Sequence, residues 1–238
     1  MAERAVGEIV ENWVAPRLPD APVLEGRWAR LERLEERHAH ALFRANAEDD
    51  AIWDYLPYGP FPSEVGYMRW VKDMAGARDP FFYAVTDRES GLAGGVMSYL
   101  RITPEVGVIE LGHINLSPRL QQTRAATEAM ILMIAWAFEA GYRRFEWKCD
   151  ALNLPSRRAA ERLGLSYEGT FRQATIVKGR NRDTAWFAAT DKDWPALQVA
   201  YDAWLDPANF DAEGGQRERL SDLTRLVRVS SDPVLAGR

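Results

Sequence analysis

The chain has 238 residues, enough for one large domain or two small ones that bury a core. Its composition of 47% hydrophobic and 27% charged residues is that of an ordinary globular protein, and its net charge of −5 gives no electrostatic argument for nucleic acid, although local arginine-rich stretches leave a polyanionic partner open. The single cysteine, Cys149, excludes an internal disulfide framework, and the lack of a signal-peptide pattern or an apolar run of membrane-spanning length leads us to expect a cytoplasmic protein that binds no membrane.

The first part of the chain predicts an arm, a strand and two helices. Residues 1–24 include the proline-rich stretch VAPRLPDAPV, which favours an extended arm. RWARLERL (27–34) alternates as a strand does, and EERHAHALFRANAE (35–48) has the apolar spacing of a helix. IWDYLPYGPF (52–61) is aromatic and interrupted by proline and glycine, so we expect a loop or a broken helix before a second helix that Ser63 can cap.

The middle of the chain changes to a period of two. FFYAVTD (81–87), LAGGVMSYLRI (92–102) and VIELGHINLS (108–117) predict three consecutive antiparallel strands with short connections. A long helix follows, and its run MILMI (130–134) is apolar on every side. Such a helix is covered by other elements on most of its surface.

The last part predicts a strand, a short helix, a hairpin and a final helix. YRRFEWKCD (142–150) alternates apolar and charged residues as a strand does, and SRRAAERLG (156–164) ends on a glycine typical of a helix C-terminus. Residues 166–190 predict a hairpin turning at KGRNRD, and 193–205 predict a helix. Residues 206–238 have little to bury, so we expect a loosely attached tail.

This order of elements, β-α-α-β-β-β-α-β-α-β-β, predicts the fold class. We expect an α+β, or mixed α/β, domain over residues 25–205, built on one mostly antiparallel central sheet flanked by helices. One β-α-β crossover lies in the middle. The arm (1–24) and the tail (206–238) then flank a single domain.

A polar turn, QQTRAA (121–126), joins the third middle strand to the long helix. A strand that opens directly into a helix leaves the first backbone N–H groups without partners. With the helix dipole, these groups form a site for a phosphate or pyrophosphate. The structural alternative is a helix start that is capped by Thr123 and serves packing only.

Several motifs in the second half of the chain occur in a fixed order. They are ATEA at 126–129, AFE at 137–139, Asn153 with Ser156, RLGLSYEG at 162–169, and a Gly/Arg/Asp hairpin turn. Together they resemble the GNAT superfamily of acyl-CoA-dependent N-acyltransferases over roughly residues 27–190, and most closely the RimJ/RimL type of ribosomal-protein N-terminal acetyltransferases. The resemblance implies an enzyme of GNAT fold that transfers an acetyl group from acetyl-CoA directly to a primary amine of a peptide, a protein N-terminus or a small molecule.

The resemblance also implies where CoA binds. In that family the turn has the pattern Gln/Arg-x-x-Gly-x-Gly/Ala, and its amides bind the CoA pyrophosphate. Here Arg124 occupies the glycine position, where its guanidinium can itself bind phosphate. The implied CoA-binding residues are Ile114, Leu116, Gln121, Gln122, Thr123, Arg124, Ala125, Ala126, Thr127, Asn153, Ser156 and Arg157.

Direct transfer needs a base for the amine and a donor to the thioester carbonyl. The resemblance places the donor at a backbone N–H within 114–116. Glu110 and His113 on the same strand are the candidate bases; an exposed strand residue and a half-buried residue bonded to backbone are the respective alternatives. Because a glycine lies between them, we expect a β-bulge at 111–112 that turns both side chains toward one face.

The acid and the acceptor site are also drawn from the resemblance. Ser156 lies near the thioester sulfur in that family and can protonate the departing thiolate, or it can simply cap the helix. The tyrosine that many members use four residues later is Ala160 here. The implied acceptor-binding residues are Trp53, Tyr55, Tyr58, Phe61 and Arg172.

Other polar clusters leave alternatives open. The basic group Arg172, Lys178, Arg180 and Arg182 can contact an anionic acceptor or the CoA 3′-phosphate, or be a solvated hairpin. His38 and His40 point apart on a helix and complete no metal site, so we expect no metal. A homodimer stays open. The functional alternatives are a resistance or detoxification enzyme for an aminoacyl-nucleotide-like compound, and a non-catalytic acyl-CoA-binding relative.

Overall fold

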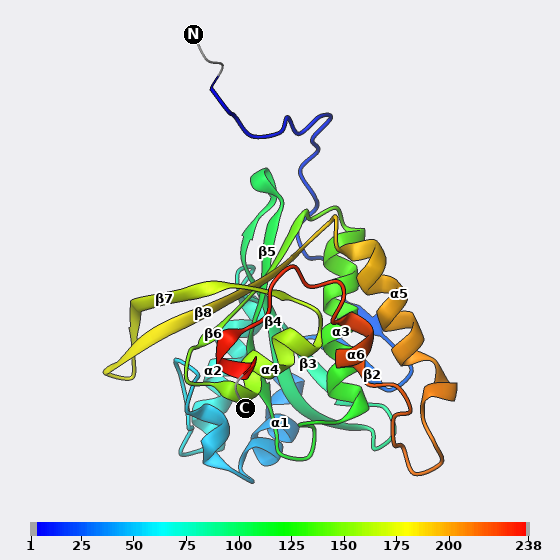
Figure 1. Cartoon of the computed structure of the whole chain (residues 1–238). Helices are drawn as coiled ribbons and strands as arrows, with labels where there is room; N and C mark the ends of the chain where they lie inside the picture. Colours follow the sequence, from blue (N-terminus) through cyan, green and yellow to red (C-terminus); the bar gives the residue numbers. More distant parts are fainter. Residues whose placement is uncertain (1–3, 237–238) are drawn as a thin grey trace.

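The computed structural model describes residues 4–236, and its centre is one eight-stranded sheet (Figure 1). The strand order is β1-β2-β3-β4-β5-β6-β8-β7. Neighbouring strands are antiparallel except β5 and β6, which are parallel and joined through α3. The expected mostly antiparallel sheet with a central β-α-β crossover is thereby confirmed. The strands are β1 Val23–Glu25, β2 Ala29–Arg33, β3 Phe81–Asp87, β4 Leu92–Thr103, β5 Val108–Leu116, β6 Arg144–Asp150, β7 Ser166–Val177 and β8 Arg180–Thr190.

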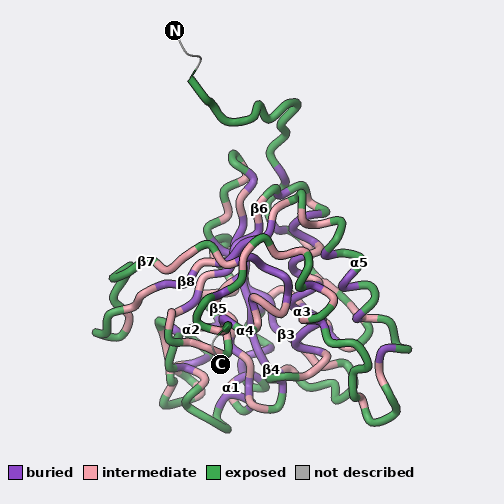
Figure 2. The backbone as a smooth tube through the Cα atoms, in the orientation of Figure 1, coloured by how far each residue is buried: buried purple, intermediate pink, exposed green. Residues whose placement is uncertain are grey.

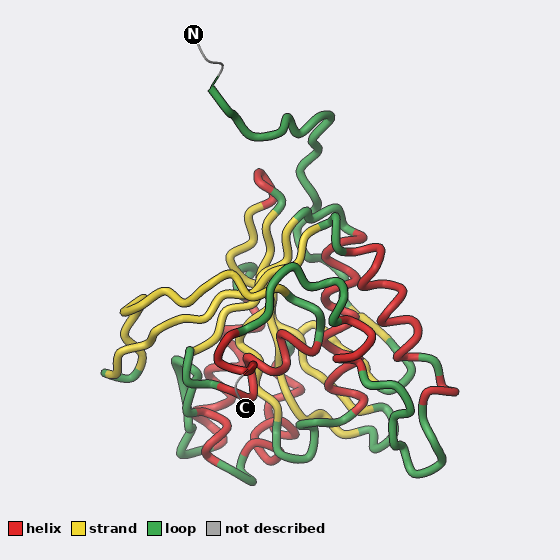
Figure 3. The backbone as a smooth tube through the Cα atoms, viewed as in Figure 1, coloured by secondary structure: helices red, strands yellow, loops and turns green. Residues whose placement is uncertain are grey.

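Helices cover both faces of the sheet (Figure 3). The α-helices are α1 Ala39–Asn46, α2 Glu64–Gly76, α3 Arg124–Glu139, α4 Leu154–Arg162, α5 Trp194–Leu205, α6 Leu220–Thr224 and α7 Pro233–Ala236. Short 3₁₀ turns are η1 Glu36–His38, η2 Asp50–Trp53, η3 Pro104–Val106 and η4 Pro207–Asn209. No helix within residues 4–236 is both long and apolar enough to cross a membrane.

Buried residues gather along the strands of the sheet and in α3 (Figure 2). The two faces of the sheet bury separate hydrophobic cores. On one face, α3 and α5 pack on Tyr83, Tyr99 and Phe145. On the other, α1 and α2 pack on Phe82 and Val96. The alternation of strand side chains sends successive residues to opposite faces, which is why Phe82 and Tyr83 belong to different cores.

Helix α3 fits the expectation of a helix covered on most sides. Twelve of its sixteen residues are buried. Thr123 caps it, because its Oγ1 accepts a hydrogen bond from the Ala126 N–H at 3.1 Å. Ser63 likewise caps α2 through the Gly66 N–H.

The sheet splits between β5 and β6. These strands pair over only four positions, ending at Leu111 opposite Trp147. Beyond that point, β5 continues to Leu116 paired with β4 alone, and β6 continues to Asp150 paired with β8 alone. The backbone groups of residues 112–116 that face the split have no partner strand, so they are available to a ligand, except the Leu116 carbonyl, which accepts from Gln121 Nε2 at 3.0 Å.

Both ends of the chain differ from the sequence-based prediction. A short strand, β1, falls within the predicted arm and pairs with β2, and residues 4–22 of the arm form neither helix nor strand. The C-terminal segment is not loosely attached, because Leu220, Thr224 and Asp232 are buried. Its apolar residues are few, and the attachment comes from ion pairing and hydrogen bonds, which an apolar pattern does not reveal.

Candidate active site

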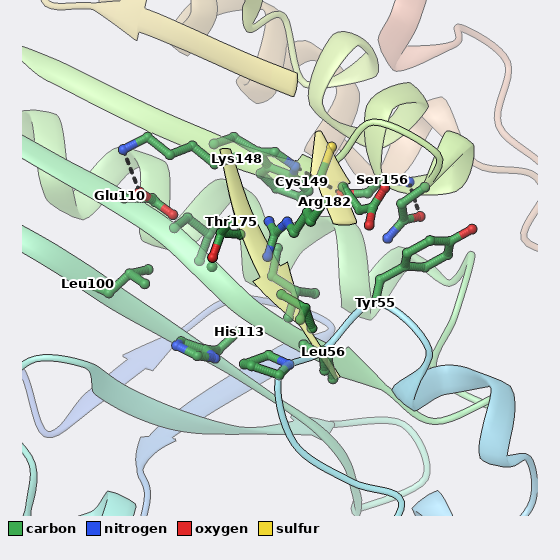
Figure 4. A pocket seen from close by; sticks show the side chains of 18 of the residues that line it. Tyr55, Leu56, Leu100, Glu110, His113, Lys148, Cys149, Ser156, Thr175 and Arg182 are labelled. Carbon is green, nitrogen blue, oxygen red and sulfur yellow. Dashed lines mark hydrogen bonds and ion pairs between the residues drawn. The ribbon is translucent and has the colours of Figure 1, made fainter. Parts of the chain in front are cut away.

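A cavity of about 350 Å³ opens at the split between β5 and β6 (Figure 4). It is lined by the split strands β5 and β6, the neighbouring strand β4, the start of α4, η2 with the loop after it, and the β7–β8 hairpin. The lining includes Glu110, His113 and Ile114 from β5, Lys148 and Cys149 from β6, Asn153 and Ser156 from α4, Tyr55 and Leu56 from the loop, and Thr175 and Arg182 from the hairpin. Segments far apart in sequence therefore meet around one space.

Glu110 is buried at the edge of this cavity and held by two cations. Its Oε1 accepts a hydrogen bond from Arg101 at 2.6 Å, and Lys148 Nζ lies 2.9 Å from Oε2. Lys148 also lies 2.7 Å from Glu146 and 3.9 Å from the centre of the Trp186 ring. Burial raises the pKa of the Glu110 carboxyl, while the charges of Lys148 and Arg101 oppose that rise.

His113 lies on the same strand and also lines the cavity. Its ring stacks on Tyr58, with centroids 5.5 Å apart, and lies against Phe82 at 5.3 Å. Its buried Nδ1 has no hydrogen-bond partner among residues 4–236. Burial, helped by the charges of Arg101 and Arg182, lowers the pKa of His113 to about 4. The imidazole is therefore neutral at pH 7.

The strand contains a β-bulge, but not where the sequence predicts it. Pairing with β4 shifts between Asn115 opposite Val96 and Gly112 opposite Ser98, so the extra residue lies at 113–114 rather than at 111–112. His113 itself takes a left-handed φ of 50°. Its ring thereby contacts Phe82 on the same face of the sheet on which Glu110, opposite Leu100, lines the cavity. The expected shared face is found, and the glycine is not the residue that produces it.

The opposite side of the split carries Ser156 and Cys149. Ser156 Oγ accepts a hydrogen bond from Trp147 Nε1 at 3.0 Å, which leaves its own hydroxyl hydrogen free to donate. The cap of α4 is Asn153, whose Oδ1 accepts from the Ser156 N–H at 3.1 Å. The alternative of Ser156 as the helix cap is therefore wrong, because α4 begins two residues before it. Burial raises the pKa of the Cys149 thiol to about 11, so it stays protonated at pH 7.

The polar turn before α3 has an unpaired first turn and an engaged arginine. Thr123 Oγ1 takes the Ala126 N–H, while the amides of residues 124 and 125 lie in the first turn, which has no intrahelical acceptor. The Arg124 guanidinium lies over the rings of Trp28 and Phe210, at 5.3 and 5.1 Å, and 3.6 Å from Glu89. Gln121 and Gln122 are exposed, and Gln122 has a φ of 60°.

Two residues of the implied CoA site point elsewhere. Arg157 is buried and bound to both carboxylate oxygens of Asp232, at 2.6 Å each, and to the Ala151 carbonyl. It anchors the C-terminal segment on α4. Thr127 is buried as well, and its Oγ1 accepts from Arg162 at 2.8 Å. Both side chains are committed to internal partners, so they are left out of the candidate site.

The implied acceptor residues divide into two groups. Tyr55 lines the cavity, and its hydroxyl donates to the Leu152 carbonyl at 3.3 Å across the mouth. Trp53, Tyr58 and Phe61 pack with one another and with α2, although Tyr58 reaches the cavity indirectly through His113. Arg172 is exposed and does not line the cavity. Aromatic residues punctuated by proline favour a binding loop and a core equally well, so the pattern could not separate the two groups.

The sequence analysis missed Arg101 and Lys148. The signal that could have found Lys148 is the alternation of Arg144, Glu146 and Lys148 on one face of a strand parallel to β5, where Glu110 is paired with Glu146. Nothing in the sequence pairs Arg101 with Glu110.

The chain matches a family model and several solved structures. The model described as Acetyltransferase (GNAT) domain matches residues 29–166. A GCN5-related N-acetyltransferase from Brucella melitensis is 42% identical, with a TM-score of 0.88 over 91% of this chain and 100% of that one. A probable acetyltransferase (GNAT family) from Chromobacterium violaceum is 40% identical, with a TM-score of 0.76 over 82% of this chain and 99% of that one.

More distant structures share the fold. RimL, a ribosomal alpha-N-protein acetyltransferase, is 20% identical, with a TM-score of 0.63 over 71% of this chain and 93% of its own. No curated protein gives a significant match to the sequence.

Proposed function

This chain belongs to the GNAT acetyltransferase family, and we propose that it transfers an acetyl group from acetyl-CoA directly to a primary amine held at the split between β5 and β6. The observation that carries the proposal is the cavity itself. Its β5 side presents Glu110, and its α4 side presents the Ser156 hydroxyl. A protein N-terminus, the acceptor implied by the RimJ/RimL resemblance, and a small-molecule amine are both primary amines of the kind this cavity can take.

The donor fits the split and the turn beside it. Within residues 112–116, the backbone groups on the split side that have no partner offer hydrogen bonds to an extended amide chain such as pantetheine. The free amides at the start of α3, together with its dipole, suit a pyrophosphate. When bound, acetyl-CoA supplies the thioester that is attacked, and a backbone N–H within 114–116 is the proposed donor to its carbonyl oxygen.

Glu110 is the proposed base, acting through a water. At pH 7 an amine is mostly protonated, so a proton must leave before the nitrogen can attack. The pKa of Glu110 is raised toward the working pH, whereas that of His113 is lowered away from it. General-base efficiency is greatest when the pKa lies near the working pH, which favours Glu110 over His113. His113, neutral and unpaired at Nδ1, orients the water.

Ser156 is the proposed acid. Its Oγ accepts from Trp147, which orients the hydroxyl and leaves its hydrogen available on the cavity side. Cys149 stays a neutral neighbour because its pKa is raised. Ser156 therefore protonates the departing thiolate, the role that many family members give to a tyrosine four residues later, where this chain has Ala160.

Release of free thiol from acetyl-CoA, measured with a panel of peptides, small amines and aminoacyl adenylate analogues, tests the proposal. We expect thiol release that matches acetylated amine one for one with at least one acceptor class. Stabilisation by acetyl-CoA in a thermal melt without thiol release for any amine would instead support the non-catalytic alternative, because a ligand that binds only the folded state raises the melting temperature regardless of turnover. If acetyl-CoA neither stabilises the protein nor releases thiol, both the proposed transfer and the non-catalytic alternative are refuted.

A further inference from the structure

The cavity contains one cation that has no partner. Three cationic side chains line it: Arg101, Lys148 and Arg182. The first two are ion-paired with Glu110, at 2.6 and 2.9 Å. The Arg182 side chain makes no hydrogen bond or ion pair with any residue from 4 to 236, and its Nε is buried. A guanidinium that is half-buried without an acceptor is unfavourable unless something else binds it.

We propose that Arg182 binds an oxyanion of the acceptor, a carboxylate or a phosphate, so that the substrate is an amine carrying a negative charge a few bonds from its nitrogen. The inference rests on the proposed acetyl transfer and names the class of acceptor. The planar guanidinium offers parallel N–H donors that match the two oxygens of a carboxylate or phosphate.

The position of Arg182 is fixed by the hairpin that carries it. Arg182 is paired with Thr175 across the β7–β8 hairpin, and both residues line the cavity. The hairpin is held against the end of η2, because Lys178 Nζ donates to the Trp53 carbonyl at 2.8 Å. Figure 4 shows the Arg182 side chain projecting into the space between Cys149 and Thr175. An anion bound there lies beside the reacting groups and not at the outer rim.

The charges around the cavity also favour an anion. Its lining carries three cations and two carboxylates, Glu110 and Asp150. Glu110 is neutralised by its own two partners, and His113 is uncharged at pH 7. Three cations against two carboxylates leave the lining residues with one net positive charge, although Glu146 behind the lining also pairs with Lys148. Arg182 is the lining cation without an ion pair among residues 4–236. The acceptor is bound with its amine toward Glu110 and its oxyanion toward Arg182.

The size of the space limits the acceptor. A cavity of about 350 Å³ lies at the lower end of the range for small-molecule sites. It can hold a whole small amine, such as an amino acid or an aminoalkyl phosphate, together with the acetyl end of the donor. The acceptor thus presents its amine and its oxyanion within one small unit.

Matched acceptor pairs test this directly. Each pair differs only in the anion: a free amino acid against its amide, and an aminoalkyl phosphate against the corresponding amino alcohol. We expect Arg182→Gln to raise the KM of the anionic member by about 10- to 100-fold, the range for losing a hydrogen bond to a charged group, while the KM of the neutral member changes by less than about twofold. The pair that responds shows whether the anion is a carboxylate or a phosphate.

Two further variants separate charge, geometry and general damage. Arg182→Lys keeps the charge but loses the planar pair of donors, so its KM should lie between those of the wild type and Arg182→Gln. Lys72→Gln removes an exposed cation of α2 that does not line the cavity and should leave the KM of both members unchanged. Equal rises for anionic and neutral acceptors in Arg182→Gln, or no wild-type preference for the anionic member, would overturn the proposal.

Calorimetry with the anionic amines alone gives a readout that needs no turnover. Binding to the wild-type protein that weakens in Arg182→Gln supports the anion site even if no amine releases thiol, in which case only the proposed transfer fails. If neither the amino acids nor the aminoalkyl phosphates bind at millimolar concentration while neutral amines are acetylated, the transfer stands and the anion site is wrong.

Discussion

The two halves of β5 each carry one titratable side chain of the cavity, and burial moves their pKa values in opposite directions. Glu110 lies in the half that pairs with β6, between Arg101 and Lys148, and its pKa is raised. His113 lies in the half beyond the split, stacked on Tyr58, and its pKa is lowered to about 4. Burial disfavours the charged form of each group, which is the anion for one and the cation for the other.

This contrast explains how one strand can supply two different functions. The half of β5 that is paired on both sides is rigid and surrounded by charge, which suits a group that must carry a proton. The half beyond the split has backbone groups free on one side and an uncharged imidazole, which suits hydrogen bonding to a substrate. The bulge at residues 113–114 lies at the start of the half beyond the split, and it brings the Glu110 and His113 side chains to one cavity.

Removing the carboxylate from the paired half should have the largest effect. We expect Glu110→Gln to lower kcat by about 100-fold or more, the scale of a lost general base, with little change in acetyl-CoA affinity. Steady-state thiol release and calorimetry measure the two quantities. Glu146→Gln is the matched control, because Glu146 shares Lys148 but does not line the cavity. An equal loss of kcat in both variants would mean that the loss comes from disrupting the ion pairs with Lys148 and not from removing a general base.

In the half of β5 beyond the split, His113 should make the free energy of unfolding depend on pH. The pKa of His113 is about 4 in the folded protein and about 6.5 in the unfolded chain. As the pH drops from 6.5 to 4, the unfolded chain binds a proton that the folded protein does not, so the free energy of unfolding falls. Between pH 7.5 and 5 this one group removes about 2 kcal/mol of the free energy of unfolding. Asparagine tolerates the positive φ at this position. Between pH 7.5 and 5, the free energy of unfolding of His113→Asn should therefore fall by about 2 kcal/mol less than that of the wild type. Denaturant titrations at both pH values measure the difference, and identical losses in the two proteins would contradict it.

The turn before α3 should give the smallest of these effects. Arg124→Glu places a negative charge beside the expected pyrophosphate, so we expect acetyl-CoA affinity to fall by about tenfold or more, and by less in Arg124→Gly. Arg119→Glu makes the same charge change on an exposed residue just before this turn and serves as the control. Equal affinities for the Glu and Gly variants would mean that Arg124 acts only through its packing on Trp28 and Phe210.

The sequence predicted most of the fold because its patterns are local. The period of two in 81–87 and 108–117, and the cap at Thr123, gave elements close to those observed. The C-terminal segment was misjudged because a pair of buried charges, Arg157 and Asp232, attaches it across a long stretch of chain. No local pattern records such a pairing.

The candidate site was predicted only in part, for the same reason. Ser156 was found through its motif with Asn153, and Glu110 through its place on the strand before the long helix; both line the cavity. Arg101 and Lys148, which set the charge environment of Glu110, come from two other strands and meet only through the sheet register. The place of the bulge also depends on pairing, since the strand inserts its extra residue at His113 and not at the neighbouring glycine.

The pH dependence of single-turnover acetyl transfer tests the central claim most directly. The rate should fall as the pH drops through the raised pKa of Glu110, because only the ionised carboxylate accepts a proton. We predict that this acidic limb is present in the wild type, in Glu146→Gln and in His113→Asn, and that it is lost in Glu110→Gln together with about 100-fold of the rate. If Glu110→Gln keeps the acidic limb of the pH profile and the wild-type rate at neutral pH, then His113 or solvent takes the proton. The assignment of Glu110 as the base and of His113 as the residue that orients the water is then wrong.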